Sequence, residues 1–232
     1  MRYLAALIFS IFLLFGVCSA QGKPELKDQK DKESYSLGYQ FGQYLKMQGV
    51  DINLDVYTSA IKDALGNKES LMSKDEIIAA IRGVEQRVQA ARQKALKEKA
   101  AKNLEEGKAF LAENQKKKDV KTLPSGLQYK VLKEGSGKTP KQTDTVSVNY
   151  KGTLLDGTEF DSSYKRGQPI SFKVGEVIKG WSEALQHMKE GSKWQLFIPP
   201  DLAYGERAVG QVIPPNSTLI FEVDLIKVEE TK

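Results

Sequence analysis

The hydrophobic pattern changes its period once along this chain, close to Leu123-Pro124, and this change restricts the possible folds more than any other feature. No proline occurs from Ser73 to Leu123, and apolar residues recur there at helical steps of three and four, at Ile77, Ile81, Val84, Val88, Ala91 and Ala95. Beyond Pro124, apolar and polar residues alternate as in half-buried strands, around Val146–Tyr150, Ile170–Val174 and Leu219–Leu225. The sequence therefore predicts an α+β protein, with an all-α N-terminal part and a β-rich C-terminal part.

Three helices are predicted in the N-terminal part. The first covers residues 34–48. The second runs from the cap residue Asn53 to Leu65, where Gly66-Asn67 would end it. The third begins with a capping box formed by Ser73 and Glu76, and we expect it to extend to Lys116.

The second half of the third helix is predicted to be exposed to solvent, because the apolar seam would next fall on Glu98 and Lys102. A helix of this length would span about 65 Å at a rise of about 1.5 Å per residue, too long to pack inside one small domain. We therefore expect a long connecting helix over residues 73–118, between a helical domain of residues 21–72 and a C-terminal domain of residues 119–232.

Residues 1–20 differ from the rest of the chain. Arg2 is followed by a mainly apolar run and then by the small residues Cys18-Ser19-Ala20, the order found in a secretory signal peptide. We expect cleavage after Ala20, which would leave the mature protein without cysteine. A retained membrane anchor is one alternative. A lipoprotein acylated at Cys18 is another, less favoured because Val17 stands where a small residue is expected.

The composition excludes several kinds of chemistry. With one histidine, His187, and one cysteine, the sequence contains no two-histidine zinc site, no CxxC pair and no Gly-x-Ser-x-Gly nucleophile motif. The segment Gly135–Thr139 ends like a phosphate-binding loop, but it lacks the first glycine of that motif and a following helix. The acidic residues of 156–161 lack the spacing of a cation site. We therefore expect neither a metal nor a cofactor.

The net charge of +5 is concentrated in the predicted connecting helix, where residues 92–118 hold nine basic and four acidic residues. The lysines there are interleaved with glutamates, and few aromatic residues stand near them to stack on bases. The sequence therefore does not favour a nucleic acid as partner.

In the C-terminal part, turn residues separate the strands, and one short helix, about Trp181 to Met188, interrupts them. We expect an antiparallel sheet wrapped on this helix. Trp194 and Phe197 are expected in the core. Trp181 directly follows Gly180 at the start of the helix, where its ring could form the floor of a pocket.

Four segments of the C-terminal part resemble the FKBP-type peptidyl-prolyl isomerases, in the order of that family. They are Gly157–Ser163 (GTEFDSS), Val177–Trp181 (VIKGW), Ile198–Gly205 (IPPDLAYG) and Ile213–Phe221 (IPPNSTLIF). The N-terminal part, including Tyr35-Ser36-Leu37-Gly38, also resembles the secreted Mip-like (macrophage infectivity potentiator) members of this family from Gram-negative bacteria. The resemblance implies an FKBP-like fold and prolyl isomerase activity without a nucleophile, metal or titrating base.

The resemblance also implies a site. The family's catalytic pocket residues correspond to Tyr150, Phe160, Asp161, Trp181, Tyr204 and Phe221. Further substrate-binding residues correspond to Phe172, Val177, Ile178, Arg166 and Ile213. Trp181 would lie under the proline ring, Tyr204 would offer its hydroxyl to a substrate carbonyl, and Asp161 would be the polar group of the pocket, held by Arg166 or Tyr150. Whether Ile170 or Phe172 lines the wall stays open.

Two functions of different classes follow. The first is a prolyl isomerase that assists the folding of secreted or envelope proteins, located in the periplasm or at the outer membrane, with proline-containing unfolded polypeptides as partners. The alternative is a chaperone-type binding module, in which dimeric helical arms hold unfolded clients and isomerase activity is secondary. A homodimer through residues 34–90 is expected, because the helix carrying Gly38 and Gly42 and the apolar seam need a partner surface. Macrolide inhibitors of the FK506 class are possible ligands.

Overall fold

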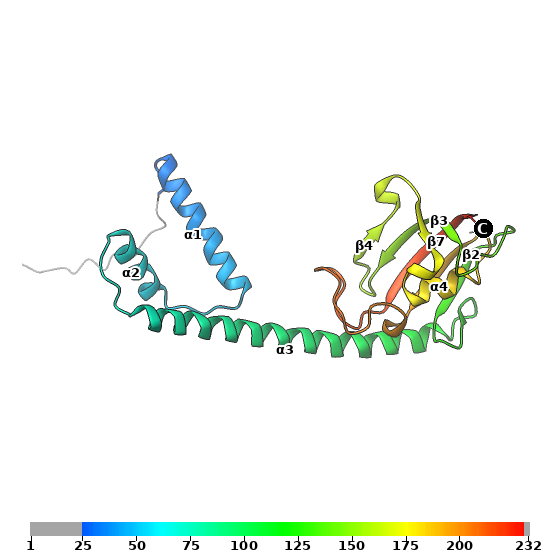
Figure 1. The fold of residues 1–232 in the computed structure, drawn as a ribbon, viewed down its shortest axis with the longest axis horizontal. Coiled ribbons are helices and arrows are strands. Elements are labelled where there is room, and N and C mark those ends of the chain that lie inside the picture. The colour runs from blue at the N-terminus through cyan, green and yellow to red at the C-terminus, as the bar shows by residue number, and fades with distance from the viewer. Residues whose placement is uncertain (1–24, 230–232) are drawn as a thin grey trace, which may run out of the picture. The chain divides into compact units, whose positions relative to one another are not determined.

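The structure is a computed structural model that describes residues 25–229, so the predicted signal peptide and Cys18 lie outside the described residues. The chain divides into two compact units between Ser73 and Lys74. The long helix therefore groups with the C-terminal sheet and not with the first two helices (Figure 1). Among the described residues, no helix is both long and apolar enough to cross a membrane.

The first unit contains the helices α1 (Gln29–Met47) and α2 (Leu54–Leu65). Helix α1 begins five residues earlier than predicted, because Asp28 caps it by accepting a hydrogen bond from the backbone N–H of Asp31. The predicted ends of α2 are confirmed: Asn53 accepts hydrogen bonds from two backbone N–H groups at the start, and Asn67 adopts a φ of 54° after the end. None of the described residues of this unit is buried.

Helix α3 (Lys74–Asn114) has 41 residues and ends two residues before the predicted Lys116. Most residues of its second half are exposed, as predicted, but one face of this half packs on the rest of the second unit. Gly107 and Asn114 are buried against the rest of the second unit. Asn114 donates a 2.9 Å hydrogen bond to the side chain of Gln128, which in turn donates to the carbonyl of Leu111. The prediction missed this face because amide side chains and a glycine make several of its contacts, and such residues leave no hydrophobic pattern.

The second unit also contains a seven-stranded antiparallel sheet with the order β1-β2-β6-β7-β3-β4, in which β5 pairs with β3. The strands are β1 (Lys121–Thr122), β2 (Gln128–Lys133), β3 (Thr145–Thr153), β4 (Glu159–Ser162), β5 (Ile170–Lys173), β6 (Lys193–Ile198) and β7 (Leu219–Glu229). The short helix α4 (Lys179–Leu185) ends three residues before the predicted Met188. Three short 3-10 turns lie at Tyr164–Arg166, Val174–Glu176 and Pro200–Leu202.

One hydrophobic core joins the sheet to α4. The inward positions of the two longest strands are buried, as their alternation predicted: Val146, Val148 and Tyr150 on β3, and Leu219, Phe221, Val223 and Leu225 on β7. Helix α4 contributes Trp181, Ala184 and Leu185 to the same cluster. Trp194 and Phe197 are buried, as expected, and the ring of Phe197 packs on Phe110 of α3 at 5.8 Å. The fold class α+β, with helices first and an antiparallel sheet wrapped on a short helix, is confirmed.

Candidate active site

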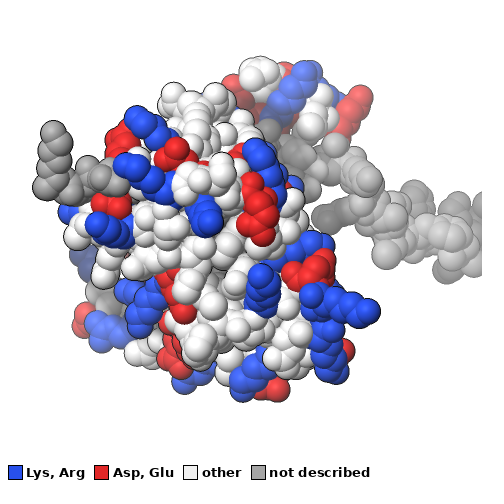
Figure 2. All heavy atoms as spheres, turned by 90° about the vertical axis from the view of Figure 1, so that its right-hand side faces the viewer, with Lys and Arg blue, Asp and Glu red and all other residues white. Residues whose placement is uncertain are grey.

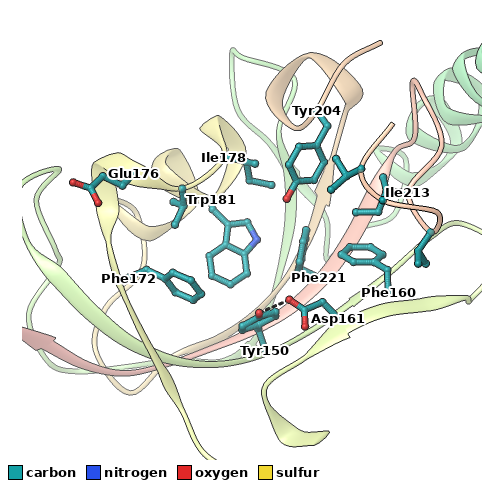
Figure 3. A pocket seen from close by; sticks show the side chains of 14 residues that line it. Tyr150, Phe160, Asp161, Phe172, Glu176, Ile178, Trp181, Tyr204, Ile213 and Phe221 are labelled. Carbon is teal, nitrogen blue, oxygen red and sulfur yellow. Dashed lines mark hydrogen bonds between the residues drawn. The ribbon is translucent and has the colours of Figure 1, made fainter. Parts of the chain in front are cut away.

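A cavity of about 530 Å³ opens between α4, the ends of β3, β4, β5 and β7, and the segment that joins β6 to β7 (Figure 3). Ten of the eleven site residues expected from the sequence line it: Tyr150, Phe160, Asp161, Phe172, Val177, Ile178, Trp181, Tyr204, Ile213 and Phe221. The eleventh, Arg166, is not a lining residue but is bonded to Asp161. The tertiary structure thus brings residues from four strands, one helix and the loops between them to one apolar pocket.

The indole ring of Trp181 forms the floor of the cavity. Its ring stands nearly perpendicular to three other aromatic rings, those of Tyr150, Phe172 and Phe221, at centroid distances of 5.1, 5.8 and 5.2 Å. Such edge-to-face contacts fix the orientation of an aromatic side chain. Trp181 is therefore held flat under the pocket, where an apolar ring of a ligand can stack on it.

Gly152 on β3 makes room for one wall. A Cβ atom at this position would lie 2.6 Å from the ring of Phe160 and 2.7 Å from the ring of Phe221, closer than real contacts allow. Gly152 pairs with Asp161 on β4 and with Phe221 on β7, so it lies at the centre of the wall. The sequence prediction missed this residue, because a glycine inside a strand gives no sign of what packs over it.

The register of β5 decides between Ile170 and Phe172. Both residues pair with β3, Phe172 opposite Val146 and Ile170 opposite Val148. Only Phe172 lines the cavity, while Ile170 packs against the core from outside it.

Asp161 is the carboxylate of the pocket, and its two oxygens are held by neighbours on different elements. Oδ2 accepts a 2.5 Å hydrogen bond from the hydroxyl of Tyr150 (Figure 3), and Oδ1 accepts a 2.6 Å charged hydrogen bond from Nη1 of Arg166. Oδ1 also accepts from the backbone N–H of Ser162. Burial alone would raise the pKa of Asp161, but the hydrogen bonds from Tyr150 and Arg166 lower it below its ordinary value. Asp161 is therefore an anion with a fixed orientation.

Tyr150 links this anion to the core. Nη2 of Arg166 donates a 2.7 Å hydrogen bond to the Tyr150 hydroxyl, which itself donates to Asp161. Burial, and then the hydrogen bond to the Asp161 carboxylate, raise the pKa of Tyr150 to about 12. Tyr150 therefore stays protonated at neutral pH and acts as a donor only towards Asp161.

Tyr204 faces the cavity from the opposite side, and its hydroxyl points inward (Figure 3). Burial, and then the charge of Asp161, raise the pKa of Tyr204 above its ordinary value. No protein group within residues 25–229 forms a hydrogen bond with this hydroxyl. It is available as a donor to a ligand.

Four lining residues were not among the eleven site residues expected from the sequence: Glu176, Val209, Gly210 and Val212. The last three belong to a small hairpin closed by backbone hydrogen bonds between Val209 and Ile213. Gly210 has a φ of 58° and makes the turn of this hairpin possible.

The described residues include no cluster of three or more His, Cys, Asp or Glu side chains that could hold a metal ion. On the face of the protein shown in Figure 2, Lys and Arg side chains alternate with Asp and Glu side chains and do not gather into one large basic area. The chemistry available at the pocket is therefore that of an apolar cavity with one oriented anion and one hydroxyl donor.

Comparison with known proteins agrees with this geometry. Residues 136–226 match the family described as FKBP-type peptidyl-prolyl cis-trans isomerase, and residues 30–131 match the domain described as amino terminal to it. The chain is 43% identical over 230 residues to the peptidyl-prolyl cis-trans isomerase Mip of Coxiella burnetii, covering 99% of this chain and 100% of that protein. It is 43% identical over 212 residues to the outer membrane protein MIP of Legionella longbeachae, covering 91% of each.

A solved structure shares the fold over most of the length. The crystal structure of FkpA from Escherichia coli has a TM-score of 0.75 and 42% sequence identity to this chain, and the match covers 90% of this chain and 100% of that one. With the site, the two matching family descriptions and relatives of this identity, the chain belongs to the FKBP-type peptidyl-prolyl cis-trans isomerases and has their activity.

Proposed function

We propose that the pocket lowers the barrier to rotation about an X–Pro bond by stabilising the twisted amide. Resonance holds the amide planar with a barrier of roughly 18–20 kcal/mol. The twisted amide has lost this resonance and is less dipolar, so an apolar aromatic cavity solvates it better, relative to the planar form, than water does. The observation that carries this proposal is the nearly perpendicular packing around Trp181, which fixes an apolar floor for the proline ring.

The polar groups then orient the substrate. The Tyr204 hydroxyl, which points into the cavity, would donate a hydrogen bond to a substrate carbonyl. The carboxylate of Asp161, held in place by Tyr150 and Arg166, would lie beside the substrate amide and interact with it electrostatically. No group needs to gain or lose a proton in this reaction. The proposed substrates are proline-containing unfolded polypeptides.

The test uses the chain from Gln21 onward and a short Phe–Pro peptide, with cis-to-trans conversion followed without a coupling protease. Trp181→Leu should lower kcat/KM by about tenfold or more, equivalent to about 1.4 kcal/mol of lost transition-state stabilisation. Trp194→Phe is the matched control, because Trp194 is buried beneath Tyr129 and does not line the pocket. No acceleration by the unmodified chain, or equal losses in both variants, would contradict the proposed mechanism.

Between the two functions that the sequence left open, the pocket and the names of the relatives favour the isomerase over a chaperone-type binding module in which isomerase activity is secondary. We further propose that the isomerase assists the folding of exported proteins in the periplasm or at the outer membrane. The signal-peptide pattern of residues 1–20 supports this location, and one relative is named an outer membrane protein. Mass spectrometry of the protein from the envelope of the producing cell should find Gln21 at the N-terminus; an acylated Cys18 would show the lipoprotein instead.

We propose a homodimer through residues 34–90. The first unit has no buried residue in its described part, so its helices have no core of their own. Large apolar side chains on α1 are 45% exposed or more: Tyr35, Leu37, Tyr39, Phe41, Tyr44 and Met47. Ile77 and Ile81 at the start of α3 are also exposed. A second copy would remove these surfaces from water.

The aromatic pocket also supports binding of macrolide inhibitors of the FK506 class, which would compete with proline peptides. Competitive inhibition in the peptide assay, weakened by Trp181→Leu, is the expected result. Nucleic acid is not a proposed partner, because basic and acidic side chains are interleaved along α3.

A further inference from the structure

The C-terminal half of α3 has one face that lies against the segment joining β6 to β7 (Figure 1). The residues of this face are partly or fully buried: Ala100, Asn103, Leu104, Gly107, Phe110, Leu111 and Asn114. Those that contact the loop, Ala100, Asn103 and Gly107, are small or polar. Residues of this kind let a backbone come close, and an amide can bond it, so this part of the face is suited to holding a loop.

The first part of this face, from Ala100 to Gly107, contacts residues 215–218, while Phe110 and Asn114 contact β6 and β2. Nδ2 of Asn103 donates a 2.8 Å hydrogen bond to the carbonyl of Pro215, 112 residues further along the chain. Nδ2 of Asn216 donates back to the helix, to the carbonyl of Ala100 at 3.5 Å. The two amides thus bond the loop and the helix in both directions.

Gly107 brings the helix closest to the loop. A Cβ atom on Gly107 would lie 2.3 Å from Oγ1 of Thr218, a distance that no real contact shows. Thr218 is buried, and its hydroxyl has no hydrogen-bond partner within residues 25–229. The helix and the loop are therefore in direct backbone-to-side-chain contact at this point, without room for a side chain.

The other side of the same loop borders the pocket. Ile213, only 6% exposed, is a lining residue and is also bonded to the hairpin residue Val209. The backbone N–H of Asn216 donates a 2.7 Å hydrogen bond to the carbonyl of Gly205, the residue next to Tyr204. Two walls of the cavity, one at Ile213 and one at Tyr204, are thus connected to the loop that α3 holds.

We infer that Asn103 and Gly107 of α3 are positioning residues for the isomerase reaction, which hold residues 213–218 so that Ile213 and Tyr204 face the bound proline segment. Neither residue touches the cavity described above. Their effect passes through the loop, from the carbonyl of Pro215 to Ile213 and from Asn216 to Tyr204. A helix that only supported the fold would affect stability and leave the reaction of the folded molecules unchanged.

The first test removes the amide donor in the full mature chain. Asn103→Ala and Asn103→Asp should lower kcat/KM for a Phe–Pro peptide by about 3- to 10-fold, the factor expected for one lost hydrogen bond. Gln93→Ala, an exposed amide on the same helix, is the control and should leave kcat/KM unchanged. Rates are compared well below each variant's Tm, so that loss of folded protein does not contribute. Wild-type kcat/KM in both Asn103 variants would overturn the inference.

The second test uses the close contact. Gly107→Ala should push on Thr218 and lower kcat/KM, whereas Gly83→Ala, on the same helix with its nearest neighbour at 3.5 Å, should not. Thr218→Ala removes the Oγ1 atom without removing a hydrogen bond, so the double variant Gly107→Ala/Thr218→Ala should recover most of the activity. A loss that the second substitution does not relieve, or equal kcat/KM in Gly107→Ala and Gly83→Ala, would show that the contact with the loop does not matter for the reaction.

Discussion

The Tyr150 hydroxyl and Oδ2 of Asp161 lie 2.5 Å apart, the shortest link between the buried core and the polar edge of the pocket among the hydrogen bonds described above. Tyr150 packs edge-on against the indole of Trp181, and Asp161 is paired with Arg166 on its other side. Tyr150 therefore both orients the anion of the pocket and packs against the aromatic floor.

Removing this link should impair the reaction more than it impairs folding. Asp161→Asn keeps the shape of the side chain but removes its charge, and we expect kcat/KM to fall by about tenfold. Tyr150→Phe keeps the ring and leaves Arg166 as a partner of Asp161, so a smaller loss is expected. Glu159→Gln, two residues earlier on β4 and outside the pocket, is the control. Equal effects of the Asp161 and Glu159 variants in the peptide assay would refute a specific role for Asp161.

The reaction should not depend on pH between about pH 5 and 9. The lowered pKa of Asp161 means that its contribution to stability is complete above the ordinary value of 3.8 and is lost as the pH falls through the lower folded value. The pKa of Tyr150 is raised from 10.0 to about 12, so its contribution is complete below pH 10 and is lost as the pH rises towards 12. Measurements of kcat/KM and Tm across this range test the prediction; a bell-shaped profile within it would indicate a titrating catalytic group.

Gly152→Ala should disturb the wall formed by Phe160 and Phe221. The added methyl group would overlap both rings, and such overpacking costs about 1–3 kcal/mol of unfolding free energy. Because the rings can relieve the clash by moving into the cavity, kcat/KM should fall together with the Tm. Urea unfolding and the peptide assay measure the two effects. A variant with unchanged stability and activity would show that the strand can shift to accept the methyl group.

A charge on the exposed face of α1 should dissociate the proposed dimer. Leu37→Glu and Phe41→Glu place a carboxylate among apolar side chains that are 69% and 45% exposed in the single chain. Sedimentation equilibrium at tens of micromolar, a range that covers ordinary interface strengths, should detect dimers of the unmodified chain and monomers of these variants. Gln40→Glu, an exposed polar position on the same helix, is the control. A monomeric unmodified chain at this concentration would rule out the dimer.

The sequence predicted well the features that depend on neighbouring residues, such as helix caps, and those that depend on the alternation of exposed and buried positions along a strand. The ends of α2 follow from Asn53 and Gly66-Asn67, because a cap and a left-handed residue act on their own helix. The alternation on β3 and β7 predicted which residues are buried there. Eight of the eleven expected pocket residues lie in the four segments that resemble the family, and ten of the eleven line one cavity.

Contacts between small or polar residues far apart in the sequence were decided by the tertiary structure alone. Gly152 could not be identified as a wall residue before Phe160 and Phe221 were seen to pack over it. The buried face of α3 was predicted to be exposed, because Asn103 and Gly107 are ordinary on a helix in water and become specific only through Pro215 and Thr218. Hydrophobic periodicity predicts which positions of a helix or strand are buried. It does not predict which distant segment packs closely on a glycine or accepts a hydrogen bond from an amide side chain. These contacts depend on where the fold places both segments.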